Sequence, residues 1–172
     1  MGHSYGGVVS LLAAAQRPGS VRSLTVIEPP AFAVAPDSPP VADFVERAKA
    51  LWAEGPDDPA VFLARFRGLF GSSQPPPDTS LPPEVEQGAR LLRVERGPWE
   101  AEIPLDMLAA AGFSKLVVSG AHNAAFDAVC DVLERRLGAE RAVIPGAGHS
   151  VQRTGGPFNE RLEAFLTSAA AD

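Results

Sequence analysis

The chain has 172 residues, a formal net charge of -6 and an isoelectric point near 5.1. Its length suits one ordinary domain with a real core, and its acidity argues against nucleic-acid and anionic-membrane partners, which require clustered Lys and Arg. The longest apolar run, residues 8–15, is far shorter than the roughly 20 residues that span a bilayer. Cys130 is the only cysteine, so it excludes a disulfide framework and suits a reducing cytoplasm.

The chain begins with the motif GHSYG at residues 2–6, which fits the pattern G-x-S-x-G. This pattern is typical of a nucleophile elbow, where Gly2 and Gly6 would let a strand and a helix approach closely around Ser4. Helix-forming residues follow as far as the stop RPG at 17–19, so we expect a helix to start just after Ser4. We expect no strand in front of the serine, because too little chain precedes it.

The elements that follow alternate between strands and helices. Residues 23–27 (SLTVI) form a β-branched run that Pro29 and Pro30 end, which indicates a short buried strand. The later elements that we expect are a strand in SKLVVSG, a helix from about 124 to 137, a strand in RAVIPGAGHS and a final helix in PFNERLEAFLTSAAA. Strands that alternate with helices imply an α/β fold with a parallel sheet, here of about three strands. The apolar stripe of the final helix is expected to be Phe158, Leu162, Phe165 and Leu166.

Residues 31–105 have a different character, with proline clusters between short amphipathic segments. Apolar residues recur at helical spacing in three segments, at 41–52, 61–70 and 83–96. We therefore expect a helical cap at 31–105, inserted between core regions at 1–30 and 106–172. Trp52, Trp99 and the Phe-rich helices of this insertion could line an acyl pocket or could simply form its core.

A serine hydroxyl is a poor nucleophile without a base, so the three histidines are the next candidates. His3 lies inside the motif and His122 follows a predicted strand, and we expect each of them to be structural or solvated. His149 lies in a loop just past the last predicted strand. Because parallel strands present their carboxyl ends at one edge of a sheet, Ser4 and His149 could meet there.

Together, GHSYGG, SLTVIEPP, the proline-rich insertion, KLVVSG and VIPGAGHS resemble the α/β-hydrolase fold superfamily, in particular the second half of its fold. The resemblance implies that Ser4 is the nucleophile, that the backbone N–H of Tyr5 is an oxyanion donor and that His149 is the general base. The implied protein is a serine hydrolase that acts on a small ester or similar acyl substrate. Such chemistry needs no cofactor, and we assign no metal ligands.

The residues leave open which carboxylate is the acid of the implied triad. Many such hydrolases carry an aspartate shortly after the strand that here ends in VVSG, but Asn123 stands at that position and Asp127 is the nearest aspartate. A minority of the superfamily, haloalkane dehalogenases among them, carries the acid after the strand that follows the nucleophile helix. Here that residue is Glu28, which we assign as the acid, with Asp127 and no acid at all as the alternatives.

The resemblance also implies four or five strands upstream of the elbow. The alternative function is therefore a non-catalytic, truncated hydrolase-like fragment, or a module that depends on a partner chain. Without an upstream partner strand, residues 23–27 would present an apolar strand edge, which is a template for self-association.

Overall fold

The computed structural model describes residues 1–71, 74–76 and 80–170, and the chain forms two compact units. Unit 1 consists of Met1–Val41 and Pro98–Asp172, and unit 2 consists of Ala42–Gly97. Parts of the proline-rich stretch at 72–83, and the last residue of the predicted final helix, lie outside the described residues. A cap at 31–105 stays a prediction. Among the residues described, no helix is both long and apolar enough to cross a membrane.

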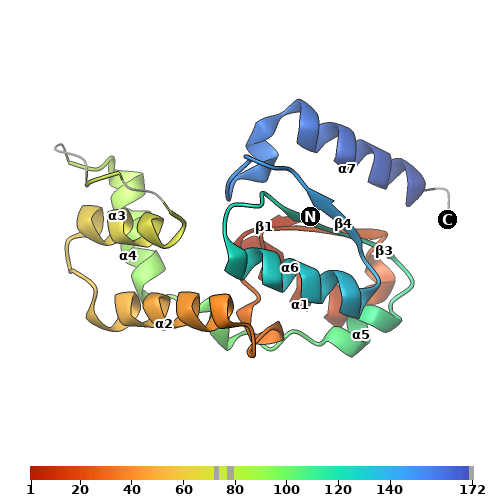
Figure 1. Cartoon of the computed structure of the whole chain (residues 1–172), viewed down its shortest axis with the longest axis horizontal. Coiled ribbons are helices and arrows are strands. Elements are labelled where there is room, and N and C mark those ends of the chain that lie inside the picture. The colour runs from red at the N-terminus through yellow and green to blue at the C-terminus, as the bar shows by residue number, and fades with distance from the viewer. Residues whose placement is uncertain (72–73, 77–79, 171–172) are drawn as a thin grey trace. The chain divides into compact units, whose positions relative to one another are not determined.

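Unit 1 is built on a parallel sheet with the strand order β1-β2-β3-β4 (Figure 1). The strands are β1 (Gly2–His3), β2 (Ser23–Ile27), β3 (Ser114–Ser119) and β4 (Glu140–Val143). The predicted α/β class is confirmed, and the strands expected at 23–27, in SKLVVSG and in RAVIPGAGHS are present.

The expectation that no strand precedes Ser4 is wrong. Residues Gly2 and His3 pair with Val26 and Ile27 and form the fourth strand of the sheet. A two-residue strand is too short to show any periodicity, so the sequence gives no signal for it. The edge expected at residues 23–27 is covered only at its last two residues, and self-association through it stays a prediction.

Helices cover both faces of the sheet (Figure 1). The helices of unit 1 are α1 (Tyr5–Gln16), α5 (Leu105–Ala110), α6 (Ala124–Leu137) and α7 (Gly156–Ser168). Helix α1 contacts β1 and β2, and α6 contacts β3 and β4, while α7 lies on the opposite face. The helices expected after Ser4 and at 124–137 are confirmed. Helix α5 was not predicted, because its six residues are too few for a clear helical period.

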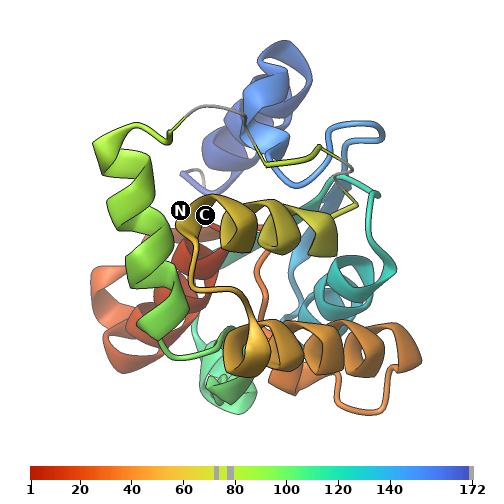
Figure 2. The ribbon, with the colours of Figure 1, turned by 90° about the vertical axis from the view of Figure 1, so that its left-hand side faces the viewer.

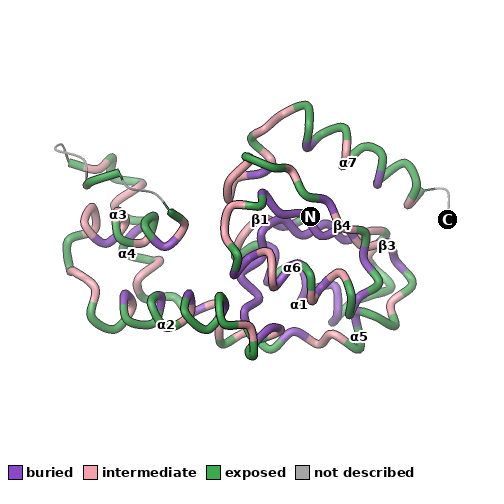
Figure 3. Tube along the Cα trace, in the orientation of Figure 1, coloured by how far each residue is buried: buried purple, intermediate pink, exposed green. Residues whose placement is uncertain are grey.

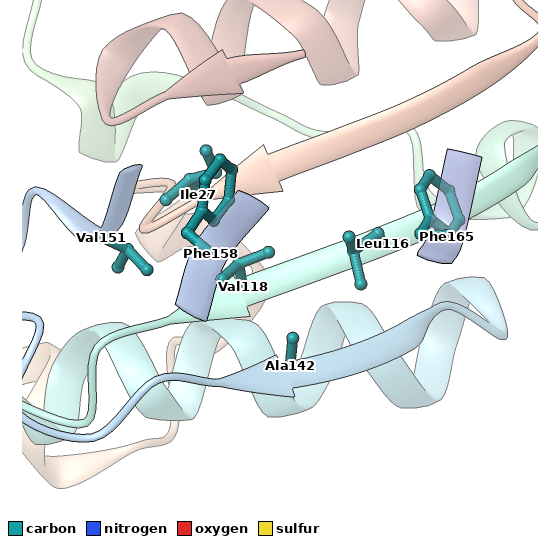
Figure 4. Packing of buried hydrophobic residues seen from close by; sticks show 7 residues of the cluster. All are labelled: Ile27, Leu116, Val118, Ala142, Val151, Phe158 and Phe165. Carbon is teal, nitrogen blue, oxygen red and sulfur yellow. The ribbon is translucent and has the colours of Figure 1, made fainter. Parts of the chain in front are cut away.

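The core beneath α7 joins neighbouring strands of the sheet. Because successive strand residues point to opposite faces, alternate residues of β2 and β3 turn the same way. Figure 4 shows the resulting cluster, which consists of Ile27, Leu116, Val118, Ala142, Val151, Phe158 and Phe165. Buried residues concentrate along these strands (Figure 3). The stripe predicted for the final helix is correct for Phe158 and Phe165, with Leu162 partly buried, but Leu166 is 46% exposed because it lies beside the buried face.

Unit 2 consists of helices with an aromatic core, seen in orange, yellow and green in Figure 2. The helices are α2 (Pro39–Glu54), which begins just before the unit, α3 (Pro59–Leu69) and α4 (Pro83–Val94). The Trp52 ring packs edge-on against Phe62 and Phe66, at centroid distances of 5.7 and 5.8 Å. Helix α3 begins where the Asp58 carboxylate accepts hydrogen bonds from the first turn. Trp52 thus belongs to the aromatic core of the unit, and a role in an acyl pocket stays a prediction.

Candidate active site

Ser4 occupies the turn between β1 and α1. Its backbone has φ 53° and ψ -129°, a conformation that costs a non-glycine residue about 1–3 kcal/mol. The Ser4 N–H donates to the Ile27 carbonyl at 2.9 Å, which ties the turn to β2. A Cβ at Gly2 would overlap the Gly6 carbonyl, so glycine is required there. The expected need for a second small residue at Gly6 is wrong, because a Cβ at that position would face open space among the described residues.

His149 reaches Ser4 from the loop after β4. Its Nε2 lies 2.9 Å from Ser4 Oγ, although the two residues are 145 positions apart in the chain. His3 supports this loop, since its Nε2 donates to the His149 carbonyl at 2.8 Å. Burial lowers the pKa of His3 despite this hydrogen bond, so the ring is neutral at pH 7. Of the two roles expected for His3, the structure therefore shows the structural one.

Glu28 follows β2 and is fully buried. Its N–H donates to the Val118 carbonyl at 2.9 Å, and its Oε1 accepts a 2.6 Å hydrogen bond from the Gly120 N–H. Its Oε2 lies 3.5 Å from His149 Nδ1, at the long limit of a hydrogen bond. Burial acts to raise the pKa of the Glu28 carboxyl, but its contacts with two histidines and with Gly120 outweigh burial and lower the pKa. Glu28 is therefore a charged carboxylate at neutral pH.

The alternative acid, Asp127, has different partners. Its Oδ1 accepts a 2.6 Å hydrogen bond from Ser119 Oγ and lies 3.5 Å from the Arg141 guanidinium. Asn123 caps α6, with its side chain accepting from the Ala125 N–H at 3.0 Å. The structure thus places Glu28 beside His149, and it places Asp127 beside Ser119 and Arg141.

Tyr5, the predicted oxyanion donor, is the first residue of α1. Its backbone N–H lies at the positive end of the helix dipole and directly follows the nucleophile candidate. This is the place where negative charge on a reacting carbonyl oxygen would be stabilised. The role of Tyr5 as donor stays a prediction.

Strained backbone gathers around these side chains. Among the described residues, the non-glycine positions with left-handed φ are Ser4, Glu28 and Ala121. They follow β1, β2 and β3, so all three lie at the carboxyl-terminal edge of the sheet. Such conformations persist only where surrounding structure enforces them, and they tend to cluster at functional sites.

His122 is the residue that sequence reasoning missed. Its Nδ1 lies 3.5 Å from Glu28 Oε2, and its ring packs against Phe126 at a centroid distance of 5.9 Å. The side chain is only 14% exposed, so of the two roles expected for His122, structural or solvated, the structure excludes the solvated one. A signal was available, because His122 lies two residues past Gly120, at the same sheet edge as Glu28 and His149.

The end of β3 and the histidine loop approach each other closely at two glycines. A Cβ at Gly120 would overlap the backbone of Gly148, including its carbonyl oxygen. Any side chain at position 120 would therefore push the loop that carries His149 away from β3. This contact brings the residues after β3 next to the residues after β4.

Comparisons with known proteins place the chain among hydrolase folds. Among solved structures, it is similar to the thioesterase domain from the curacin biosynthetic pathway, with 21% sequence identity and a TM-score of 0.40. The alignment covers 99% of this chain and 62% of that domain, so the chain spans less than two thirds of its length. A search of curated proteins finds no match. The model of the alpha/beta hydrolase family matches residues 1–161, almost the whole chain. The chain therefore belongs to the alpha/beta hydrolase family.

Proposed function

We propose that this protein is a serine hydrolase that cleaves a small ester or a similar acyl substrate. The observation that carries the proposal is the 2.9 Å distance between Ser4 Oγ and His149 Nε2. A serine that sits on a strained turn before a helix, with an imidazole in reach of its hydroxyl, has the two parts that nucleophilic catalysis requires.

In the proposed reaction, Ser4 Oγ attacks the acyl carbonyl carbon while its proton passes to His149 Nε2. The resulting oxyanion accepts a hydrogen bond from the Tyr5 N–H. His149 then gives the proton to the leaving alkoxide, and the acyl group stays on Ser4. Water attacks this acyl-enzyme with His149 again as the base, which releases the acid and restores the serine.

Glu28 would stabilise the charged imidazolium that forms at each step. Its carboxylate faces His149 Nδ1 and is fully buried, so water does not screen the attraction. The lowered pKa of Glu28 keeps it ionised at neutral pH, as this role requires. An ionised acid on Nδ1 also favours the tautomer whose Nε2 can accept the serine proton.

The decisive experiment is labelling of the purified protein with a fluorophosphonate probe, which reacts with activated serines. We expect stoichiometric labelling that Ser4→Ala abolishes. Ser20→Ala is the matched control, because Ser20 is exposed in the short 3-10 turn after α1, and it should leave labelling intact. Labelling that survives Ser4→Ala would contradict the proposal, and so would an unlabelled wild-type protein that melts cooperatively.

The substrate class can be tested with p-nitrophenyl acetate, a matched thioester and a p-nitroanilide. We expect turnover of the ester or the thioester to depend on Ser4. Turnover confined to the anilide would contradict an ester-type substrate.

A further inference from the structure

Glu28 Oε2 faces two imidazoles at once. It lies 3.5 Å from His149 Nδ1 on one side and 3.5 Å from His122 Nδ1 on the other. One potential ligand atom from each of the three residues lies within 4.8 Å of the other two. The ring centroids of His122 and His149 are 5.8 Å apart. This trio is more than the proposed hydrolysis uses, because His122 has no part in it.

The His122 ring carries unsatisfied polar groups. Within the part of the chain that the structure describes, neither of its two buried ring nitrogens has a hydrogen-bond partner. Leaving such a group buried and unpaired costs about 1–3 kcal/mol. A cation bound between His122 and Glu28 would give the Nδ1 atom of His122 a partner. The site is open from the histidine side, where the His149 side chain is 20% exposed.

We propose that Glu28, His122 and His149 form a binding site for a zinc-class divalent cation, and that this cation inhibits the enzyme. Two imidazoles and one carboxylate suit such ions. With metal–ligand distances of about 2.1 Å, tetrahedral ligands stand about 3.4 Å apart. The two distances from Glu28 Oε2 already match this value. Closing the site requires only a small approach of the two rings, and water takes the fourth position.

Inhibition follows from the imidazole chemistry of His149. A cation on Nδ1 takes the lone pair of that nitrogen, so the proton of the neutral ring must sit on Nε2. An Nε2 that carries a proton cannot accept the proton of Ser4. The cation also takes the Glu28 carboxylate away from the imidazole. The inhibitory effect rests on the proposed hydrolase function, whereas the binding of the cation does not.

Binding is tested on the chelator-treated protein by titration with Co²⁺, whose visible absorption reports tetrahedral nitrogen and oxygen ligands, and with Zn²⁺ by equilibrium dialysis. We expect one Zn²⁺ per chain, and at least tenfold weaker binding in both His122→Phe and His122→Gln. Phenylalanine keeps the ring packing on Phe126, and thermal melts show which variants are folded. Asp127→Asn is the control, since Asp127 is a carboxylate near the same sheet edge but pairs with Ser119 and Arg141, and it should bind as the wild type does.

Inhibition is tested by ester turnover with and without Zn²⁺, each variant being compared with its own zinc-free rate. We expect at least tenfold inhibition of the wild type, almost none in His122→Phe, and none by Mg²⁺, which prefers oxygen ligands. Ser4→Ala should still bind Zn²⁺ with wild-type affinity, which separates failure of the site from failure of the hydrolase assignment. Wild-type affinity for Zn²⁺ in both His122 variants would overturn the proposal. Zinc-stimulated turnover in Ser4→Ala would also overturn it, because the cation would then be catalytic.

Discussion

Glu28 and Asp127 are both carboxylates near the carboxyl ends of neighbouring strands, yet they have different surroundings. Glu28 is fully buried between two imidazoles and a backbone N–H, whereas the Asp127 side chain is 34% exposed beside Ser119 and Arg141. The partners of a carboxylate, more than its place in the chain, therefore indicate its role. By that measure Glu28 is the candidate triad acid, while Asp127 contacts Ser119 and Arg141.

The surroundings of Glu28 and those of Asp127 meet at two adjacent residues, Ser119 and Gly120. Ser119 Oγ donates to Asp127 and accepts from Arg141 at 2.8 Å, and the next residue, Gly120, donates its N–H to Glu28. Successive residues at the end of β3 thus contact different carboxylates, Ser119 the Asp127 side chain and Gly120 the Glu28 side chain. A substitution at Gly120 or at Ser119 therefore affects the surroundings of one carboxylate and leaves the other carboxylate unchanged.

The largest expected effect is the loss of kcat on neutralising Glu28, compared with neutralising Asp127. Glu28→Gln keeps the size of the side chain but removes the charge that stabilises the imidazolium, so we expect kcat for a p-nitrophenyl ester to fall about 10⁴-fold. Asp127→Asn should change kcat by less than about tenfold, since this residue lies beside Arg141 and away from the reacting groups. If only the Asp127 variant is severely impaired, the assignment of Glu28 is wrong.

A double variant tests whether Glu28 acts through His149. The double variant Glu28→Gln with His149→Ala should be about as slow as His149→Ala alone, because members of one triad act as a unit. Independent effects that multiply would argue that Glu28 only supports the fold.

An intermediate effect is expected at Gly120, which contacts Glu28. The Cβ of Gly120→Ala would overlap the Gly148 backbone, so we expect overpacking to lower the free energy of unfolding by about 1–3 kcal/mol. Displacement of the histidine loop should also lower kcat. Gly112→Ala is the matched control, because a Cβ there meets open space among the described residues. Urea unfolding and ester turnover measure both changes, and equal behaviour of the two variants would contradict the close approach.

The smallest expected effect lies on the Asp127 side. Ser119→Ala removes the hydroxyl between Asp127 and Arg141, and we expect the free energy of unfolding to fall by about 1 kcal/mol. Ester kcat should stay within about threefold, because the network does not contact the proposed reacting groups. Urea unfolding checks the first value. A large loss of turnover with unchanged stability would show that the two regions are functionally connected.

Much of the fold could be predicted from sequence periodicity. The β-branched run at 23–27 and the helical pattern at 124–137 have strong local signals, and both elements appear where they were expected. Residues 2–3 have no such signal, because their strand exists only through pairing with β2. Local patterns therefore predict elements whose own residues favour them, and they miss elements that tertiary contacts create.

Sequence motifs identified some residues of the candidate site but not all of them. Ser4 and His149 were found from a motif and a loop position, and the structure brings them together. The assignment of Glu28 as the acid came from the family resemblance and left Asp127 open, because the tertiary structure decides which carboxylate faces the histidine loop. His122 was missed although its position two residues past Gly120 marks it as a neighbour of that sheet edge, since its contact with Glu28 spans two strands and follows no fixed spacing.

The long sequence separations within the site have a consequence for the order of folding. Contacts within α1 and α6 are local, and local contacts are expected to form first, whereas Ser4 and His149 are 145 residues apart and Glu28 and His149 are 121 apart. Closing such long loops requires most of the parallel sheet to be in place first. The reactivity proposed for Ser4 would therefore arise late in folding, and a partly folded chain with intact helices would carry Ser4 as an ordinary, unreactive hydroxyl.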